Sequence, residues 1–291
     1  MTQAVPLRYT NVSFAYEKEP VLRDLSLDIR PGELTLLAAP NGAGKTTLLW
    51  LAAGLLSPGE GQVEVFTQSP FSERSVLGQV GFLAQGAPLP TLWTGQQVYD
   101  FQRDTFPEWD DSLCDKLTTL FKLDLSKKVK TLSRGERGKL ALATMLCTRP
   151  KLLLLDEPTL GLDVATRRML QAEILDRLAE EGCSILLSSH EIAEAERKAD
   201  RLVYLEDGRI SCDEAMDALL ERHQVLLWSE SVAQPPKELD WIELPTTMGK
   251  RALARSWNED AAYTWLAQGG ERETADLETI YLSLTGELDY A

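Results

Sequence analysis

The sequence predicts an α/β fold: a core with a parallel sheet, an antiparallel β subdomain at the N-terminus, an inserted helical subdomain and a small C-terminal α+β appendage. Two apolar runs, 151–156 and 183–188, are continuous, as is typical of parallel strands buried on both faces. Between them, residues 164–181 have the pattern of an amphipathic helix, which Gly182 closes as a C-terminal cap. This order of strand, helix and strand predicts a βαβ unit.

The N-terminal part of the chain has mainly strand patterns. Residues 7–29 alternate apolar and polar side chains in several pieces, which suits strands with one buried face in an antiparallel sheet. Residues 34–38 form a short apolar run that predicts a buried strand. A helix is expected over 46–56, and residues 62–66 return to a strand pattern.

A helical pattern replaces the strands after residue 94. Helices are expected over 96–106 and 111–121, and we place an inserted helical subdomain at about 90–148. A further helix over 191–199 and a hairpin with its turn at Asp207-Gly208 complete a larger domain, which we place at residues 1–220.

The remainder, 221–291, predicts a small accessory domain. Prolines interrupt the chain there, and four of the seven tryptophans lie in this part. Strands are expected at 224–228 and 251–256, and a helix at 260–267.

Composition and charge narrow the possible partners and location. The net charge is −15, and residues 206–291, with 18 acidic and 7 basic side chains, carry −11 of it. Nucleic acid and anionic membrane surfaces repel such a tail, so neither is expected as a direct partner. No stretch approaches the roughly 18 to 20 apolar residues of a membrane span. The first residues lack the basic start and apolar core of a signal peptide, so a cytoplasmic location is expected.

The four cysteines are far apart in the sequence and form no CxxC pair. They have no nearby histidine, since the chain has only two. This spacing predicts reduced thiols, with neither a disulfide framework nor a zinc site. The four are Cys114, Cys147, Cys183 and Cys212.

A glycine-rich loop gives the strongest single indication of function. It follows the predicted strand 34–38 and opens a helix, as a phosphate-binding P-loop does. Glycines let backbone N–H groups turn toward phosphates, Lys45 supplies a cation, and the Thr46 hydroxyl can ligate Mg²⁺. An incidental glycine-rich turn is the alternative. The candidate nucleotide-binding residues here are Asn41, Gly42, Ala43, Gly44, Lys45, Thr46 and Thr47.

Two acidic residues end the apolar run 152–155. Asp156 lies where a P-loop protein needs a carboxylate to hold Mg²⁺. Glu157, directly after it, is a candidate general base for water. Acids and prolines also commonly end strands, so a simple strand end is the alternative.

Ser133 and Gly135 stand directly before a predicted helix, in the segment 132–136. A serine there is usually an N-cap, but a hydroxyl at a positive helix end also binds phosphate. Together with the preceding motifs, this order of elements resembles the ATP-binding-cassette (ABC) family over about the first 215 residues. The corresponding motifs are Walker A at 39–47, the Q-loop at 82–85, the signature at 132–136, Walker B at 152–157, the D-loop at 158–163 and the switch histidine at 188–190.

The resemblance implies further roles for single residues. Tyr16 would stack on adenine, Gln85 would reach Mg²⁺ and the attacking water, and His190 would contact the γ-phosphate. Ser133, Gly135 and Asp163 would contribute to nucleotide binding. The implied catalytic set is Glu157, His190 and Gln85, and the implied Mg²⁺ ligands are Thr46, Gln85 and Asp156.

Three positions depart from the usual motifs of the family. Ala39 replaces the first Walker A glycine, which is acceptable if the backbone there does not need a positive φ. Arg134 and Glu136 replace the central glycine and final glutamine of the usual Leu-Ser-Gly-Gly-Gln signature. Glu136 places a carboxylate near a bound anion.

The resemblance also implies partners. In this family the signature of one subunit closes over the P-loop nucleotide of another, so a second cassette chain, identical or different, is needed. An integral membrane permease would carry the transport path, with this chain peripheral on its cytoplasmic side. Residues 87–93 either line a groove for a permease helix or pack internally. Residues 276–286 resemble the closing segment of exporter-type cassettes, which favours export.

Two other functions stay open at this point. A soluble ABC-type ATPase acting on DNA or ribosomes is disfavoured because Gln85 and Leu132 are only 47 residues apart and the chain has one cassette. A non-hydrolysing regulatory cassette is permitted by the altered signature. It is disfavoured because all four residues expected for hydrolysis are present: Lys45, Asp156, Glu157 and His190.

Overall fold

The computed structural model describes residues 4–86, 88–159, 167–168, 182–189, 196, 198–246 and 249–285. Its contacts divide the chain into two compact units, 1–190 with 203–213 and 191–202 with 214–291. The predicted boundary at residue 220 stays a prediction. The predicted helices over 164–181 and 191–199 lie outside the described residues, except for 167–168, 196 and 198–199. No helix in the described part of the chain has both the length and the apolar character of a membrane span.

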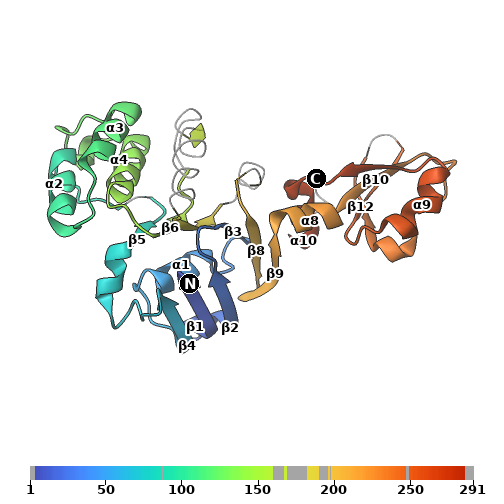
Figure 1. Cartoon of the computed structure of the whole chain (residues 1–291), viewed down its shortest axis with the longest axis horizontal. Coiled ribbons are helices and arrows are strands. Elements are labelled where there is room, and N and C mark those ends of the chain that lie inside the picture. Colours follow the sequence, from blue (N-terminus) through green and yellow to red (C-terminus); the bar gives the residue numbers. More distant parts are fainter. Residues whose placement is uncertain are drawn as a thin grey trace. The chain divides into compact units, whose positions relative to one another are not determined.

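The first unit begins with the antiparallel sheet that the alternating pattern predicts (Figure 1). Its strand order is β2-β1-β4, and Leu7 pairs with Ile29 on one side and with Val65 on the other. These three side chains are fully buried, because alternate residues face the core. The strands are β1 (Leu7–Tyr16), β2 (Glu19–Ile29) and β4 (Glu60–Val65).

The central sheet of this unit has six strands in the order β5-β6-β7-β3-β8-β9. The pairs β5/β6, β6/β7 and β3/β7 are parallel, and every residue of β3, β6 and β7 is buried. Burial on both faces explains why these strands are continuous apolar runs. The bounds are β3 (Leu34–Ala38), β5 (Val80–Leu83), β6 (Leu152–Asp156), β7 (Ser184–Ser188), β8 (Arg201–Glu206) and β9 (Arg209–Ala215).

Helix α1 (Lys45–Ala52) follows β3 and packs its leucines into the core that the two sheets share. The predicted helix over 46–56 is too long at its C-terminal end. Gly54 adopts a positive φ of 66°, its N–H bonds to Leu51 O, and the N–H of Leu55 bonds to Trp50 O. This Schellman arrangement closes the helix.

Three helices form the predicted inserted subdomain and lie apart from the antiparallel sheet in Figure 1. Side chains of Thr94, Asp110 and Ser133 accept backbone N–H groups at the three N-termini, which starts each helix where it is observed. The helices are α2 (Gly95–Thr105), α3 (Asp111–Phe121) and α4 (Arg134–Leu146).

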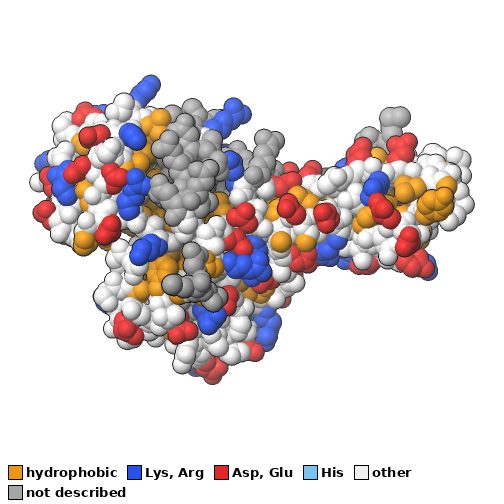
Figure 2. All heavy atoms as spheres, in the orientation of Figure 1, with side chains coloured by type: hydrophobic (Ala, Val, Ile, Leu, Met, Phe, Trp, Pro, Cys, Tyr) orange, Lys and Arg blue, Asp and Glu red, His pale blue; other side chains and the backbone are white. Residues whose placement is uncertain are grey.

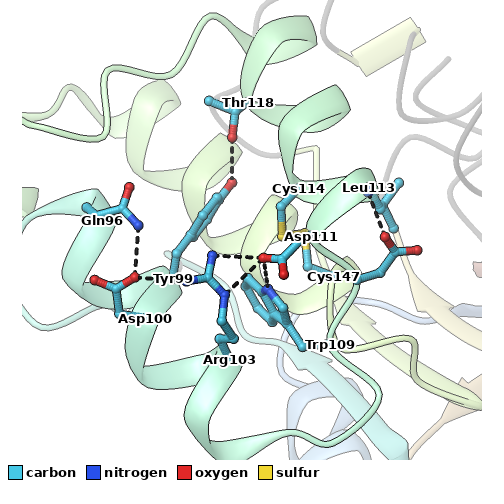
Figure 3. A network of polar contacts seen from close by, with 11 residues as sticks. Gln96, Tyr99, Asp100, Arg103, Trp109, Asp111, Leu113, Cys114, Thr118 and Cys147 are labelled. Carbon is cyan, nitrogen blue, oxygen red and sulfur yellow. Dashed lines mark hydrogen bonds and ion pairs between the residues drawn. A yellow bond between two sulfur atoms is a disulfide. The ribbon is translucent and has the colours of Figure 1, made fainter.

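Polar contacts connect α2 to α3 (Figure 3). The Arg103 guanidinium donates to Asp111 through Nε, at 2.9 Å. The Tyr99 and Thr118 hydroxyls lie 3.2 Å apart, and Trp109 also donates to Asp111. These contacts fix the relative position of two of the three helices.

A disulfide joins Cys114 in α3 to Cys147 at the end of α4 (Figure 3). The prediction of four reduced thiols is therefore wrong for this pair. Both residues are buried where α3 packs against α4, and their Cα atoms are 5.7 Å apart although 33 positions separate them in sequence. Cys183 and Cys212 are buried thiols.

The second unit contains a four-stranded antiparallel sheet in the order β11-β12-β10-β13. The predicted elements at 224–228, 251–256 and 260–267 correspond to β10, β12 and α9, while β11 and β13 were not predicted. The elements are α8 (Met216–Arg222), β10 (Gln224–Trp228), β11 (Trp241–Glu243), β12 (Lys250–Ala254), α9 (Glu259–Ala267), β13 (Glu271–Thr274) and α10 (Leu277–Thr285).

Tryptophans form the centre of this second unit. The Trp228 ring packs edge-on against Trp241 and Trp265, with ring centroids 6.0 and 6.2 Å apart. The Trp265 N–H donates to a backbone carbonyl, so its polar atom is satisfied inside the core. Acidic side chains are spread over the face of this unit that Figure 2 shows, with fewer basic ones among them.

Candidate functional site

The loop between β3 and α1 has the backbone that a phosphate-binding loop requires. Gly42 and Gly44 both have positive φ, 82° and 107°, and Gly44 is the N-cap of α1. A Cβ on Gly44 would also approach the Val21 and Leu22 side chains to 3.0 Å, so glycine is needed there. Ala39 does not adopt a positive φ and is almost fully buried, so its methyl group fits where the family has glycine.

Lys45 lies at the start of α1 and folds back over this loop. Its Nζ donates to Ala39 O at 2.7 Å and to Pro40 O at 3.3 Å. Burial lowers the pKa of the Lys45 ammonium group, and the negative charges of Glu157 and Asp156 oppose that shift. The cation is thus held at the loop with two carboxylates nearby.

Asp156 ends β6 and is 2% exposed. Each of its carboxylate oxygens accepts one hydroxyl: Thr46 Oγ1 donates to Oδ2 at 2.8 Å, and Ser188 Oγ donates to Oδ1 at 2.7 Å. The parallel register pairs Asp156 with Ser188 across β6 and β7, so the ladder itself brings them together. The carboxylate is therefore fixed in orientation from two sides.

Glu157 follows Asp156 with a φ of 50°, in the left-handed region that non-glycine residues rarely occupy. Its N–H lies 3.2 Å from both the backbone oxygen and the hydroxyl of Ser188. Unfavourable backbone conformations of this kind are concentrated at functional sites. This turn places Glu157 on the wall of the cavity that contains Lys45.

These groups surround one cavity of about 430 Å³. Tyr16 lies at its edge, 41% exposed, with its hydroxyl 3.4 Å from Thr47 Oγ1. Gln85 reaches the same cavity from the loop after β5, whereas Ala43 packs against the core instead. The lining residues are Tyr16, Val21, Pro40, Asn41, Gly42, Gly44, Lys45, Thr46, Thr47, Gln85, Asp156 and Glu157.

The signature residues are not part of this cavity. Ser133 is the N-cap of α4, and Gly135 is in the first turn of that helix. The Ser133 hydroxyl accepts the Glu136 N–H at 3.1 Å, and the Glu136 carboxylate accepts the Ser133 N–H at 2.8 Å. This is a complete capping box. Asp163 and His190 lie outside the described residues.

Sequence reasoning missed the contacts of Ser188. Within the switch-histidine motif 188–190, the sequence predicts a role for the histidine alone. The signal was present in its position, because Ser188 ends the apolar run that pairs with the run ending in Asp156. Two neighbouring parallel strands end at the same edge of a sheet, so a polar residue there faces the same site.

A family model described as ABC transporter matches residues 22–160. The chain is 31% identical over 212 residues to the ABC transporter ATP-binding protein YtrB of Bacillus subtilis (strain 168), covering 73% of each chain. The chain belongs to the ABC transporter family. It is also 33% identical over 247 residues to the Nod factor export ATP-binding protein I of Rhizobium johnstonii, covering 83% of this chain and 79% of the relative.

Solved structures share the fold. An ATP-binding subunit of an ABC transporter aligns with a TM-score of 0.69 and 26% identity, covering 74% of this chain and 92% of that one. The dimeric cassette MJ0796 in a post-hydrolysis state with ADP and Pi aligns with a TM-score of 0.64 at 23% identity, over 72% and 98% of the two chains. As an ATP-binding cassette, the chain binds and hydrolyses ATP.

Proposed function

We propose that this chain drives an exporter-type ABC transporter, paired with a second cassette chain and bound to a separate membrane permease. The observation that carries the proposal is the single cavity that joins Lys45, Thr46, Asp156 and Glu157. It brings together a cation, a hydroxyl and two carboxylates beside a helix N-terminus, which is the set of groups that phosphoryl transfer to water uses.

The P-loop is proposed to bind the phosphates of ATP. Its glycine conformations turn backbone N–H groups inward, α1 adds the positive end of its dipole, and Lys45 adds a full charge. Tyr16, partly exposed at the edge of the cavity, is proposed to stack on adenine. The remaining proposed phosphate contacts are Asn41, Gly42, Ala43, Gly44, Thr46 and Thr47.

Thr46 and Asp156 are proposed to hold Mg²⁺, with Gln85 as a further ligand. Mg²⁺ takes oxygen ligands, and it uses one or two protein carboxylates together with substrate phosphates. The Thr46 hydroxyl and the Asp156 carboxylate are 2.8 Å apart, and Gln85 lines the same cavity. The residues therefore fit this metal, which when bound neutralises negative charge on the phosphate oxygens.

Glu157 is proposed as the general base. Its carboxylate would take a proton from a water molecule as the water oxygen bonds to the γ-phosphorus. The bond between that phosphorus and the bridging oxygen then breaks, which releases ADP and phosphate. Gln85 is proposed to orient the water, and His190 to contact the γ-phosphate.

A second chain is proposed because one chain does not complete the site. Ser133 and Gly135 lie at the start of α4 and do not line the P-loop cavity. The resemblance to the family assigns them, with Asp163, to the nucleotide of another cassette. The structural likeness to dimeric cassettes supports this arrangement at the level of the fold.

The permease is proposed to dock in a separate hollow of the first unit. This hollow, of about 500 Å³, lies between β5 and the helices α2 and α4. Pro88 and Leu89, in the segment that follows Gln85, contribute to its wall, and Phe106 closes another side. Docking there would hold the chain at the cytoplasmic side of the cell membrane as a peripheral subunit.

Export is favoured by the relatives and by the C-terminal segment. The names of two relatives refer to Nod factor export and to lantibiotic transport in Streptococcus pyogenes, the latter 32% identical over 72% of this chain and 91% of the relative. The segment 276–286, which resembles the end of exporter-type cassettes, forms helix α10 over Leu277–Thr285.

The substitution Glu157→Gln tests the proposed mechanism. Turnover should fall by roughly 100-fold or more, because a general base contributes 10²-fold to 10⁴-fold. Binding of ATP should persist, so an ATP-bound dimer should accumulate and be visible by size-exclusion chromatography. Glu60→Gln, on an exposed part of β4, is the matched control. Parental turnover in Glu157→Gln would show that another group is the base.

Turnover of the purified chain with and without its permease separates the remaining alternatives. Stable ATP binding without turnover in the assembled complex would favour a regulatory clamp. Isolation of the native complex from membranes without any permease would favour a soluble ATPase.

A further inference from the structure

Ser188 connects the two acidic residues of the site. It is the last residue of β7 and is fully buried. Its hydroxyl donates to Asp156 Oδ1 at 2.7 Å and accepts the N–H of Glu157 at 3.2 Å. Its backbone oxygen accepts the same N–H at 3.2 Å. One small side chain therefore contacts the proposed Mg²⁺ ligand and the backbone of the proposed base.

A hydroxyl suits this position because it is both donor and acceptor. A serine offers one O–H donor and two acceptor lone pairs. Here the donor is used on the Asp156 carboxylate and an acceptor on Glu157 N–H. Alanine, cysteine or valine would fill a buried strand end, but none reproduces both contacts with similar strength.

The two hydroxyls on Asp156 differ in one respect. Thr46 donates to Oδ2, but its hydroxyl oxygen is also proposed to bind the metal. Ser188 belongs to neither the proposed metal ligands nor the proposed nucleotide contacts. The hydrogen bond from Ser188 to Asp156 Oδ1 can persist when Thr46 binds the metal. It keeps Asp156 Oδ2 turned toward the cavity.

We propose that Ser188 is a positioning residue for ATP hydrolysis, which aligns the Asp156 carboxylate and fixes the left-handed turn that carries Glu157. This proposal rests on the roles proposed above for Asp156 and Glu157. Residues that orient metal ligands from behind typically change metal affinity or activity by about 10-fold to 100-fold when they are removed. Ser188 should therefore affect both Mg²⁺ dependence and turnover while nucleotide binding itself is kept.

The test compares Ser188→Ala, Ser188→Thr and Ser184→Ala in the purified full chain. Ser184 is the matched control, because it is a buried serine at the other end of β7, where it accepts the Gly32 N–H at 2.9 Å. The first readout is the binding of trinitrophenyl-ATP in EDTA. The second is the Mg²⁺ concentration that gives half of the maximal increase in binding and half of the maximal turnover. The third is the turnover of ATP, resolved into kcat and KM.

For Ser188→Ala we expect binding in EDTA within about twofold of the parent, a Mg²⁺ requirement raised about tenfold and kcat lowered by about 10-fold to 100-fold, with little change in KM for ATP. Ser188→Thr, which keeps the hydroxyl, should return both the Mg²⁺ requirement and kcat most of the way to the parental values. Ser184→Ala should lose thermal stability without a change in Mg²⁺ requirement.

Equal Mg²⁺ dependence and kcat in Ser188→Ala and Ser184→Ala would overturn the proposal, because the hydroxyl would then be only structural. If Ser188→Ala does not fold, Ser188→Cys keeps the volume with a weak donor, and parental behaviour in that variant would also overturn it. Glu157→Gln separates this proposal from the base assignment. If Glu157→Gln has parental turnover while Ser188→Ala has a raised Mg²⁺ requirement, Glu157 is not the general base. The proposal that Ser188 aligns Asp156 would then still stand.

Discussion

The P-loop and the start of α4 are both proposed to contact ATP phosphates, but they are built differently. At the P-loop, Lys45 brings a cation to a cavity that already contains Asp156 and the helix N-terminus. At α4, Ser133 and Glu136 bond to each other in a capping box. The first end is prepared for an anion by this chain alone. At the second, Ser133 already makes hydrogen bonds within the chain before it meets the nucleotide that another chain is proposed to hold.

The two ends also differ in charge. Hydrogen bonds from the Ser133 N–H and hydroxyl hold the pKa of the Glu136 carboxyl below its usual value, and Lys127 at 3.5 Å assists. Since the folded pKa is depressed, this contribution to stability is present above the unfolded pKa and is lost as pH falls through the folded pKa. At neutral pH the anion at the α4 end, Glu136, therefore lies among the cations Arg134, Arg137 and Lys127. At the P-loop, the cation Lys45 lies beside the anions Asp156 and Glu157.

Removing the cation should have the largest effect on nucleotide binding. Lys45→Ala deletes the charge at the P-loop and leaves the α4 end intact, so binding and turnover should both fall, turnover by roughly 100-fold or more. Equilibrium titration with trinitrophenyl-ATP measures nucleotide binding, and the rate of phosphate release measures turnover. The control is Lys18→Ala in the turn between β1 and β2. Binding unchanged in Lys45→Ala would mean that the backbone N–H groups suffice.

Removing the Glu136 charge at α4 should strengthen the productive interaction with ATP, by less than the loss of Lys45 weakens it. Glu136→Gln keeps an acceptor for the Ser133 N–H but deletes a charge worth about 1 kcal/mol at close range in water. The ATP concentration for half-maximal turnover should therefore fall by about fivefold, more at low salt than at high salt. Glu136→Asp, which keeps the charge, should not show this gain. A loss of turnover in Glu136→Gln would instead assign the carboxylate a positive role.

Sequence patterns predicted most of the P-loop end of the site. The loop at 39–47 is a local feature, and Asp156 and Glu157 follow a recognisable buried strand. The hydroxyl of Ser188 was missed because its contacts depend on the register between two strands with 27 residues between them. The capping box at Ser133 was half predicted: the N-cap was recognised, but the reciprocal bond from Glu136 was not.

In the fold, the predictions failed where the decisive contact is not local. The cysteines were expected to be reduced because of their spacing, yet packing of α3 against α4 brings Cys114 to Cys147. Strand β11 has only three residues, and all four residues of β13 are exposed. Such strands have no apolar alternation to detect, and pairing with β12 and β10 defines them.

Reducing the disulfide should have the smallest effect on nucleotide binding of the changes considered. Its main effect should be to make the helices α3 and α4 less rigid. The bond closes a 33-residue loop within the helical subdomain, and loops of that size contribute roughly 3–4 kcal/mol to stability in chain-entropy terms. Dithiothreitol should therefore increase hydrogen exchange in α3 and α4 while β3 and β6 stay protected and ATP binding in EDTA is unchanged. Cys114→Ser should show the same exchange with and without reductant. Equal exchange of the parental chain in both conditions would mean that helix packing alone positions Ser133, so the two ends would differ in charge and not in rigidity.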